Sequence, residues 1–172
     1  MIQARPFLRA VAFAALLLAC DLATGQEKRM PDKAAPFTLT GLDGKPVRLS
    51  DYKGKVILLD FWATWCVACQ TEVPRFIAFQ NKYGDQGFQV IGISMDDTPY
   101  PVRKFYAQYK LNYPVAMGTT KVADSYGGVL GLPLTYLIAR NGRIIRQYDA
   151  SADFEQMEAE IKLLLSQENA PE

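Results

Sequence analysis

The sequence predicts an α/β domain in which a mixed central sheet carries helices on both faces. Two near-continuous apolar runs, at residues 55–63 and 88–96, are typical of strands that are buried on both faces of a sheet. Helix-like patterns separate the strand-like segments, and strands that alternate with helices pair in parallel. The dipeptide Asn141-Gly142 joins two later strand-like segments and therefore predicts an antiparallel hairpin at one edge.

The first half of the domain is expected to contain a hairpin, a strand, a helix and a second strand. Asp43-Gly44 lies between short apolar stretches and indicates the hairpin. Apolar residues at helix spacing, among them Val73 and Phe76, indicate the helix. In this order, the elements are predicted at residues 37–49, 55–63, 67–83 and 88–96.

The second half begins with another helix, because Pro101 suits a first helical turn and Val102 and Phe105 follow at helix spacing. A short strand, a short helix that ends at glycine, the two hairpin strands and a last amphipathic helix complete the domain. These elements are predicted at residues 113–117, 121–128, 132–139, 143–150 and 153–166.

The composition fits one globular domain and excludes several classes of function. The chain has 172 residues, enough for one ordinary domain, and 49% of them are hydrophobic. Its 19 basic and 18 acidic residues leave a net charge of +1, so no basic field indicates a nucleic-acid partner. It contains no histidine, which excludes imidazole metal ligands and Ser-His or Cys-His catalytic pairs.

Residues 1–19 are predicted to be an export signal. The positive charges of Arg5 and Arg9 precede an apolar run at 10–19, which is shorter than the about 20 residues that a membrane-spanning helix needs. Export places the chain in an oxidising compartment of the bacterial cell envelope, where a cysteine pair can be a disulfide.

The cleavage site of this signal has two interpretations. The segment Leu17–Cys20 is similar to a bacterial lipobox, so Cys20 is expected to carry a lipid that anchors the chain at the inner membrane. Residues 20–35, of which 26–35 are polar, would then form a linker that keeps the domain near the membrane surface. The alternative is cleavage after Gly25, which would leave a soluble periplasmic protein.

Cys66 and Cys69 are the candidate reactive residues. Cys66 falls where the first buried strand ends and a helix begins, and the unpaired N–H groups of a first helical turn stabilise a thiolate. Cys66 is therefore expected to be the more exposed cysteine and to attack a partner disulfide. Cys69, one turn further along, is expected to be buried and to resolve the mixed disulfide.

Other uses of this cysteine pair stay open from the residues alone. A structural zinc site needs four ligands, and no second cysteine pair or histidine completes such a set, so no metal site is expected. Copper(I) could use the two thiolates together with Met95 and Met117. An inert disulfide that closes so short a loop would add little stability. Thiol–disulfide exchange is the favoured interpretation.

The chain resembles the TlpA/ResA-like thioredoxin-fold proteins over residues 35–167. The resemblance rests on the opening segment APFTLTGLDGKPVRLSDYKGKVILLDFWATWCVAC, on its continuation CQTEVP and on GLPLTYLI. It implies a thioredoxin-like domain at residues 36–168 with an N-terminal β-hairpin and an inserted helix, followed by a tail at 169–172. It also implies a thiol–disulfide oxidoreductase that needs no cofactor.

The resemblance implies roles for particular residues. Pro133 would be a cis-proline that faces the disulfide and, with Leu132, would bind a partner peptide, while Trp65 would cover the site. Glu72 would tune the thiols, and Asp60 matches the buried aspartate that handles the proton of the inner cysteine in thioredoxin. The structural alternatives are a turn proline at Pro133, core packing of Trp65, a solvated acid at Glu72 and an inward polar residue at Asp60.

The expected function is the reduction of disulfides in exported proteins, among which the resemblance includes apocytochromes c. The resemblance also implies that a membrane thiol-electron transporter recharges the protein, which is expected to be a monomer. Val67-Ala68 between the cysteines adds no charge or donor and favours a mildly reducing potential.

Two other functions are weighed against this one. A thiol peroxidase of the peroxiredoxin superfamily would carry a Pro-x-x-x-Thr/Ser-x-x-Cys loop, which Leu59 and Ala63 do not match. A copper-binding chaperone would bind metal at the reduced cysteines with little turnover of disulfides.

Overall fold

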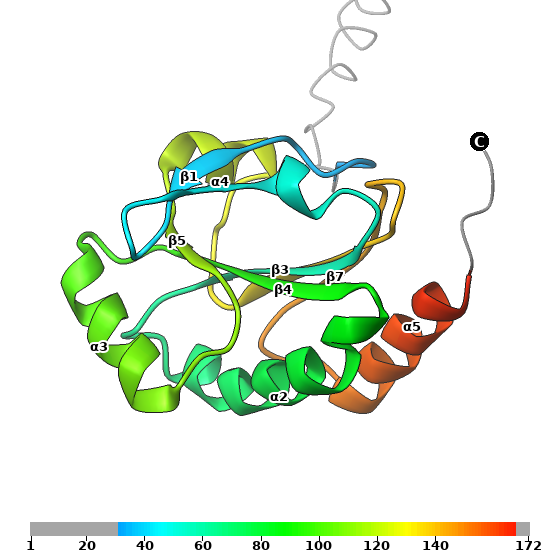
Figure 1. The fold of residues 1–172 in the computed structure, drawn as a ribbon. Coiled ribbons are helices and arrows are strands. Elements are labelled where there is room, and N and C mark those ends of the chain that lie inside the picture. The colour runs from blue at the N-terminus through cyan, green and yellow to red at the C-terminus, as the bar shows by residue number, and fades with distance from the viewer. Residues whose placement is uncertain (1–30, 168–172) are drawn as a thin grey trace, which may run out of the picture.

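The computed structural model describes residues 31–167, and its elements follow the predicted order. Figure 1 shows a central sheet with α2, α3 and α5 on one face and α4 with the β1–β2 hairpin on the other. The strands are β1 (Thr38–Thr40), β2 (Pro46–Arg48), β3 (Val56–Trp62), β4 (Phe88–Ser94), β5 (Val115–Met117), β6 (Leu134–Ile138) and β7 (Ile144–Tyr148). The helices are α2 (Val67–Tyr83), α3 (Pro99–Tyr109), α4 (Thr120–Ser125) and α5 (Phe154–Ser166), with short 3-10 turns at Leu49–Tyr52 and Gly84–Gln86.

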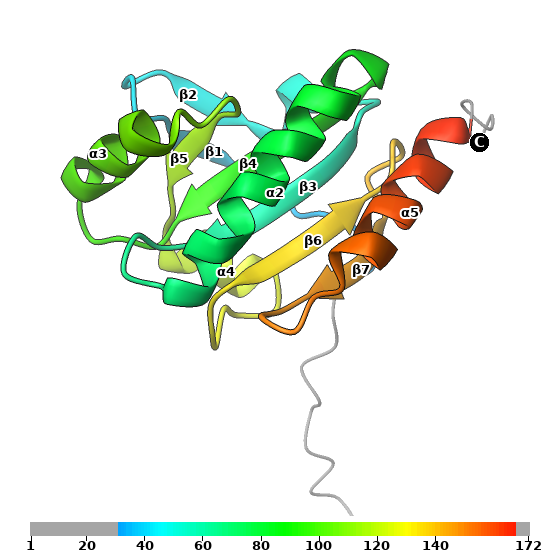
Figure 2. The same cartoon turned by 90° about the horizontal axis from the view of Figure 1, so that it is seen from below.

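The sheet is mixed, as the sequence predicts. Its strand order is β5-β4-β3-β6-β7, with β3 parallel to β4, β4 parallel to β5, and β6 antiparallel to both β3 and β7 (Figure 2). Every residue of the two central strands β3 and β4 is buried. This confirms that the two longest apolar runs are strands covered on both faces.

Apolar side chains from alternating positions of the strands form a core on each face of the sheet. On one face, Val73, Phe105 and Ile161 bring α2, α3 and α5 onto the sheet. On the other face, Leu39 and Tyr126 belong to a second cluster under the hairpin and the end of α4. The prediction of helices on both faces is therefore confirmed.

Both predicted hairpins form, and both use the same turn. The N–H of Gly41 donates to the carbonyl of Lys45 at 2.7 Å, and the N–H of Ala139 donates to the carbonyl of Arg143 at 2.9 Å. In each turn the glycine, Gly44 or Gly142, has a φ near +80°, while the preceding Asp or Asn does not have a positive φ. The turns are therefore longer than two residues, with the glycine at the left-handed position of a bulge.

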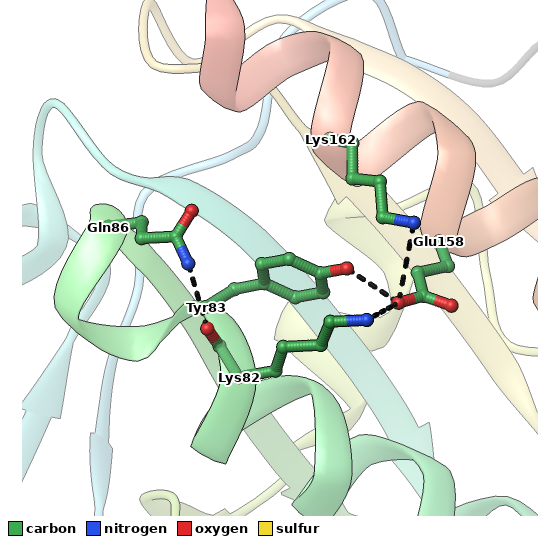
Figure 3. Close-up of polar contacts among 5 residues, drawn as sticks. All are labelled: Lys82, Tyr83, Gln86, Glu158 and Lys162. Carbon is green, nitrogen blue, oxygen red and sulfur yellow. Dashed lines mark hydrogen bonds and ion pairs between the residues drawn. The ribbon is translucent and has the colours of Figure 1, made fainter.

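The C-terminal end of α2 is joined to α5 by one carboxylate (Figure 3). Glu158 Oε1 accepts hydrogen bonds from Lys82 Nζ at 2.7 Å and from the Tyr83 hydroxyl at 2.5 Å. The hydrogen bond from Lys82 is the largest cause of a pKa of Glu158 lowered to about 2. Lys162, one helical turn along α5, is 3.7 Å from the same oxygen. This contact fixes the end of α2 that lies far from its cysteines.

The last part of the predicted linker packs on the domain. The N–H of Ala34 donates to the carbonyl of Gly142, and the N–H of Ile144 donates to the carbonyl of Asp32. The predicted signal, Cys20 and the tail lie outside the described residues. Within residues 31–167, no helix is both long enough and apolar enough to cross a membrane.

Candidate active site

A disulfide links Cys66 and Cys69 where β3 gives way to α2. Cys66 is the N-cap residue of α2, and its Sγ accepts a hydrogen bond from the backbone N–H of Cys69 at 3.1 Å. The first turn of α2 therefore directs the N–H of Cys69 at the Cys66 sulfur, and the helix N-terminus favours negative charge there. Cys66 is 7% exposed and Cys69 is 2% exposed, so Cys66 is the more accessible of the two.

Two acids predicted from the sequence are buried, one in β3 before the disulfide and one in α2 after it. Asp60 is 2% exposed in β3, where Thr135 of the adjacent strand β6 donates to its Oδ1 at 3.1 Å. Glu72 is 5% exposed on α2, and its Oε2 is buried without a hydrogen-bond partner among the described residues. Glu72 is therefore no solvated surface acid.

The surroundings of both acids favour their neutral forms. Burial raises the pKa of Asp60 to about 7, against the hydrogen bond from Thr135, which lowers it. Burial, followed by the charges of Asp60 and Asp149, raises the pKa of Glu72 to about 8. The negative charge of Asp60 is one of the causes that raise the pKa of Glu72, so an ionised Asp60 favours the protonated form of Glu72.

Two further residues interact electrostatically with these acids, and neither was predicted as a site residue from the sequence. Tyr113, which precedes β5, is 2% exposed, and burial together with the charges of Asp60 and Glu72 raises the pKa of its phenol. Asp149, directly after β7, affects the pKa of Glu72. Neither residue carries a local sequence signal, because only the pairing of the strands brings them to the two acids.

The predicted proline lies beside the end of β3. The peptide bond between Leu132 and Pro133 is cis, and Phe61 of β3 pairs with Leu134, which places Pro133 next to the strand end that leads to Cys66. Pro133 also borders a cavity of about 540 Å³. Among the residues that line this cavity are Tyr126, Leu130, Leu132, Gln147 and Asp149.

The turn before Cys66, the first residue of α2 and the loop before Pro133 expose apolar side chains. Trp65 is 67% exposed and Val67 is 75% exposed, on either side of Cys66, and Leu130 in the loop before Pro133 is 93% exposed. Trp65 is therefore not part of the core.

The residues named for the two alternative functions do not assemble into those sites. Met117 packs against the same cluster as the cysteines, whereas Met95 packs against the cluster on the other face of the sheet. Leu59 and Ala63, at the positions of the peroxiredoxin proline and hydroxyl residue, are both fully buried.

Comparisons with known proteins agree with this geometry. A family model described as the AhpC/TSA family matches residues 30–147. The thiol-disulfide oxidoreductase ResA of Bacillus thuringiensis subsp. konkukian (strain 97-27) is 36% identical over 140 residues, which is 81% of each chain. The ResA of Bacillus subtilis (strain 168) is 34% identical over 124 residues, 71% of this chain and 69% of the relative.

Solved structures show the same fold. A thiol:disulfide interchange protein of the thioredoxin family from Chlorobium tepidum TLS superposes with a TM-score of 0.73 at 26% identity, over 80% of this chain and 99% of that one. The exposed lipoprotein thioredoxin Etrx1 of Streptococcus pneumoniae strain TIGR4 superposes with a TM-score of 0.65 at 30% identity, over 76% of this chain and all of that one. The chain therefore belongs to the AhpC/TSA family and, within it, to the TlpA/ResA-like thiol–disulfide oxidoreductases with a thioredoxin-like fold.

Proposed function

We propose that this oxidoreductase reduces disulfides in exported proteins at the periplasmic side of the inner membrane. The observation that carries the proposal is the Cys66–Cys69 pair at the start of α2, in which Cys66 is the more accessible cysteine, together with two buried acids in β3 and α2. A helix N-terminus favours the thiolate that attacks a disulfide, and buried acids accept or supply the protons.

The reaction transfers two electrons and two protons from the reduced pair to the partner. The Cys66 thiolate attacks one sulfur of the partner disulfide, so that a mixed disulfide forms and the partner's other sulfur leaves as a thiolate. The Cys69 thiolate then attacks Cys66 Sγ and releases the second partner sulfur. The products are the Cys66–Cys69 disulfide and a partner dithiol.

Asp60 and Glu72 would handle the proton of Cys69. Cys69 is 2% exposed, so its proton cannot pass directly to bulk water. Asp60 has a pKa of about 7 and Glu72 one of about 8, values at which a carboxyl group both accepts and releases a proton near neutral pH.

The exposed apolar side chains of Trp65, Val67 and Leu130 would bind the partner polypeptide, with Leu132 and Pro133 beside them.

We infer that a membrane thiol-electron transporter reduces the disulfide again, since a periplasmic reductant needs a supply of electrons. Apocytochromes c are one expected class of substrate. One chain holds both cysteines and both acids, so the protein would act as a monomer.

The reduction potential of the Cys66–Cys69 pair tests the direction of electron flow. We expect a value near that of thioredoxin, about −270 mV, because Val67 and Ala68 add no charge that would stabilise the thiolate further. The measurement equilibrates the full chain with glutathione and dithiothreitol buffers and counts free thiols, with Cys20→Ser as the background. A value near −120 mV, about that of a strong oxidant, would reverse the proposed direction.

Lipid attachment at Cys20 would hold the domain at the membrane. One structural relative is named an exposed lipoprotein, which supports this part of the proposal. We expect radiolabelled palmitate to enter the full-length protein in a Gram-negative host and not to enter Cys20→Ala. Equal labelling of both chains, or no labelling of the parent, would contradict the anchor and leave cleavage after Gly25.

A further inference from the structure

Thr64 and Trp65 are the central residues of a tight turn that ends at Cys66. The backbone N–H of Cys66 donates to the carbonyl of Ala63 across this turn at 3.1 Å. Because β3 ends at Trp62 and α2 begins at Val67, the turn makes up most of the connection between strand and helix. Its conformation therefore sets the direction in which the Cys66 side chain leaves the backbone.

Asp96 binds Thr64 with both of its carboxylate oxygens. The backbone N–H of Thr64 donates to Oδ2 at 2.9 Å, and the Thr64 hydroxyl donates to Oδ1 at 2.5 Å. The two residues are 32 positions apart, and Asp96 follows the end of β4. The two hydrogen bonds from Thr64 to one planar carboxylate group fix both the position and the rotation of Thr64. Hydrogen bonds to a carboxylate are stronger than those between neutral groups.

The surroundings hold this contact in place. Asp96 is 9% exposed, and its Oδ2 also accepts a hydrogen bond from the hydroxyl of the fully buried Ser94 at 2.9 Å. From the other side, Gln70 Nε2 of α2 donates to the carbonyl of Thr64 at 2.8 Å. Thr64 is therefore bound through its N–H, its hydroxyl and its carbonyl, and these bonds tie the turn to both β4 and α2.

We propose that Asp96 is a positioning residue for thiol–disulfide exchange: it holds Thr64, and through the turn it aligns the Cys66 sulfur with the disulfide of the partner. The inference rests on the proposed role of Cys66 as the attacking thiol. Exchange requires the attacking sulfur to approach along the axis of the partner's S–S bond, so alignment of Cys66 affects its rate. Reaction of the same thiol with a small alkylating agent requires much less alignment.

The test compares four variants of the full chain with the parent, all with Cys20→Ser so that only Cys66 and Cys69 react. Asp96→Asn and Thr64→Val each weaken the contact, whereas Thr64→Ser keeps the hydroxyl and the N–H. Asp97→Asn is the matched control, because Asp97 is the exposed neighbour of Asp96. The rate constant for reduction of insulin by the reduced protein is measured by acid quench and thiol alkylation, and the rate of iodoacetamide reaction at Cys66 is measured separately.

We expect the rate of insulin reduction to fall about 10- to 100-fold in Asp96→Asn and about 10-fold in Thr64→Val. Thr64→Ser and Asp97→Asn should stay within about twofold of the parent, and alkylation of Cys66 should change less than about threefold in all variants. If Asp96→Asn loses its near-UV circular dichroism signal, it is not folded like the parent. The comparison of Thr64→Val with Thr64→Ser then tests the inference.

Three results would overturn the inference: unchanged exchange in the folded weakened variants, an equal loss in Thr64→Ser and Thr64→Val, or an equal loss of exchange and alkylation. The last result would mean that Asp96 acts on thiol reactivity or on folding rather than on alignment. A parent that does not reduce insulin, or a Cys66→Ser chain that does, would instead contradict the proposed function on which the inference rests.

Discussion

The variant Cys66→Ser loses disulfide reduction to background, at least about 1,000-fold below the parent, because a serine hydroxyl forms no mixed disulfide. Cys66 is the N-cap residue of α2 and the more accessible of the two cysteines, so no other thiol of the described domain can replace it in the first step. Reduction of insulin by the pre-reduced protein, after free dithiothreitol has been removed, measures this loss. Cys20→Ser, which changes the cysteine outside the described residues, should retain full activity.

The variant Cys69→Ser should stop the reaction one step later. Cys66 can still attack the partner, but the mixed disulfide persists because the buried thiol that would displace the partner is absent. Partner proteins should therefore accumulate as covalent complexes on non-reducing gels and should be released by dithiothreitol. The double variant Cys66→Ser/Cys69→Ser is the control and should trap nothing.

Opposite outcomes would correct the assignment of roles. If Cys66→Ser traps partners and Cys69→Ser does not, then Cys69 is the attacking thiol despite its deeper burial. Activity that survives in Cys66→Ser would mean that disulfide exchange proceeds without the residue at the helix N-terminus.

The architecture was predictable because each element carries its own local pattern. The buried strands β3 and β4 are continuous apolar runs, and the last helix α5 has an apolar face, so their existence follows from periodicity alone. The hairpin turn at Asn141-Gly142 differs from the two-residue type that this dipeptide favours. The Asp43-Gly44 hairpin has the same turn, so in both hairpins the glycine takes the left-handed position of a three-residue loop.

The site was predictable only where its residues are local to the cysteines or belong to a family motif. Glu72 lies one turn from Cys69 on α2, and Asp60 lies in the strand that leads to Cys66. Asp96 contacts the turn before Cys66 from 32 residues away, and this contact depends on β4 lying next to β3. Such a contact has no local sequence signal, so it needed the structure.

Stability should depend on pH through the two buried acids. The folded protein raises the pKa of Asp60 to about 7 and that of Glu72 to about 8, mainly by burial, whereas both groups titrate near pH 4 in an unfolded chain. Between these values the unfolded chain has released protons that the folded protein still binds. The free energy of unfolding therefore falls as pH rises from about 4 to about 8.

Asp60→Asn should remove the part of this cost that comes from Asp60, which is buried in β3. The asparagine oxygen can still accept the hydrogen bond from Thr135, and it has no charge to desolvate. Relative to the parent, the oxidised variant should gain stability as pH rises, by about 2–3 kcal/mol more at pH 8 than at pH 5. Urea unfolding of the oxidised proteins at both pH values measures the difference.

The matched control is Asp97→Asn, since Asp97 is an exposed aspartate whose loss removes the same charge. Its stability relative to the parent should change by less than about 0.5 kcal/mol between the two pH values. A pH-independent effect of Asp60→Asn would mean that the folded protein stabilises the ionised carboxylate as well as water does. Asp60 could not then hold a proton near neutral pH, and Glu72 would be left as the acid that serves Cys69.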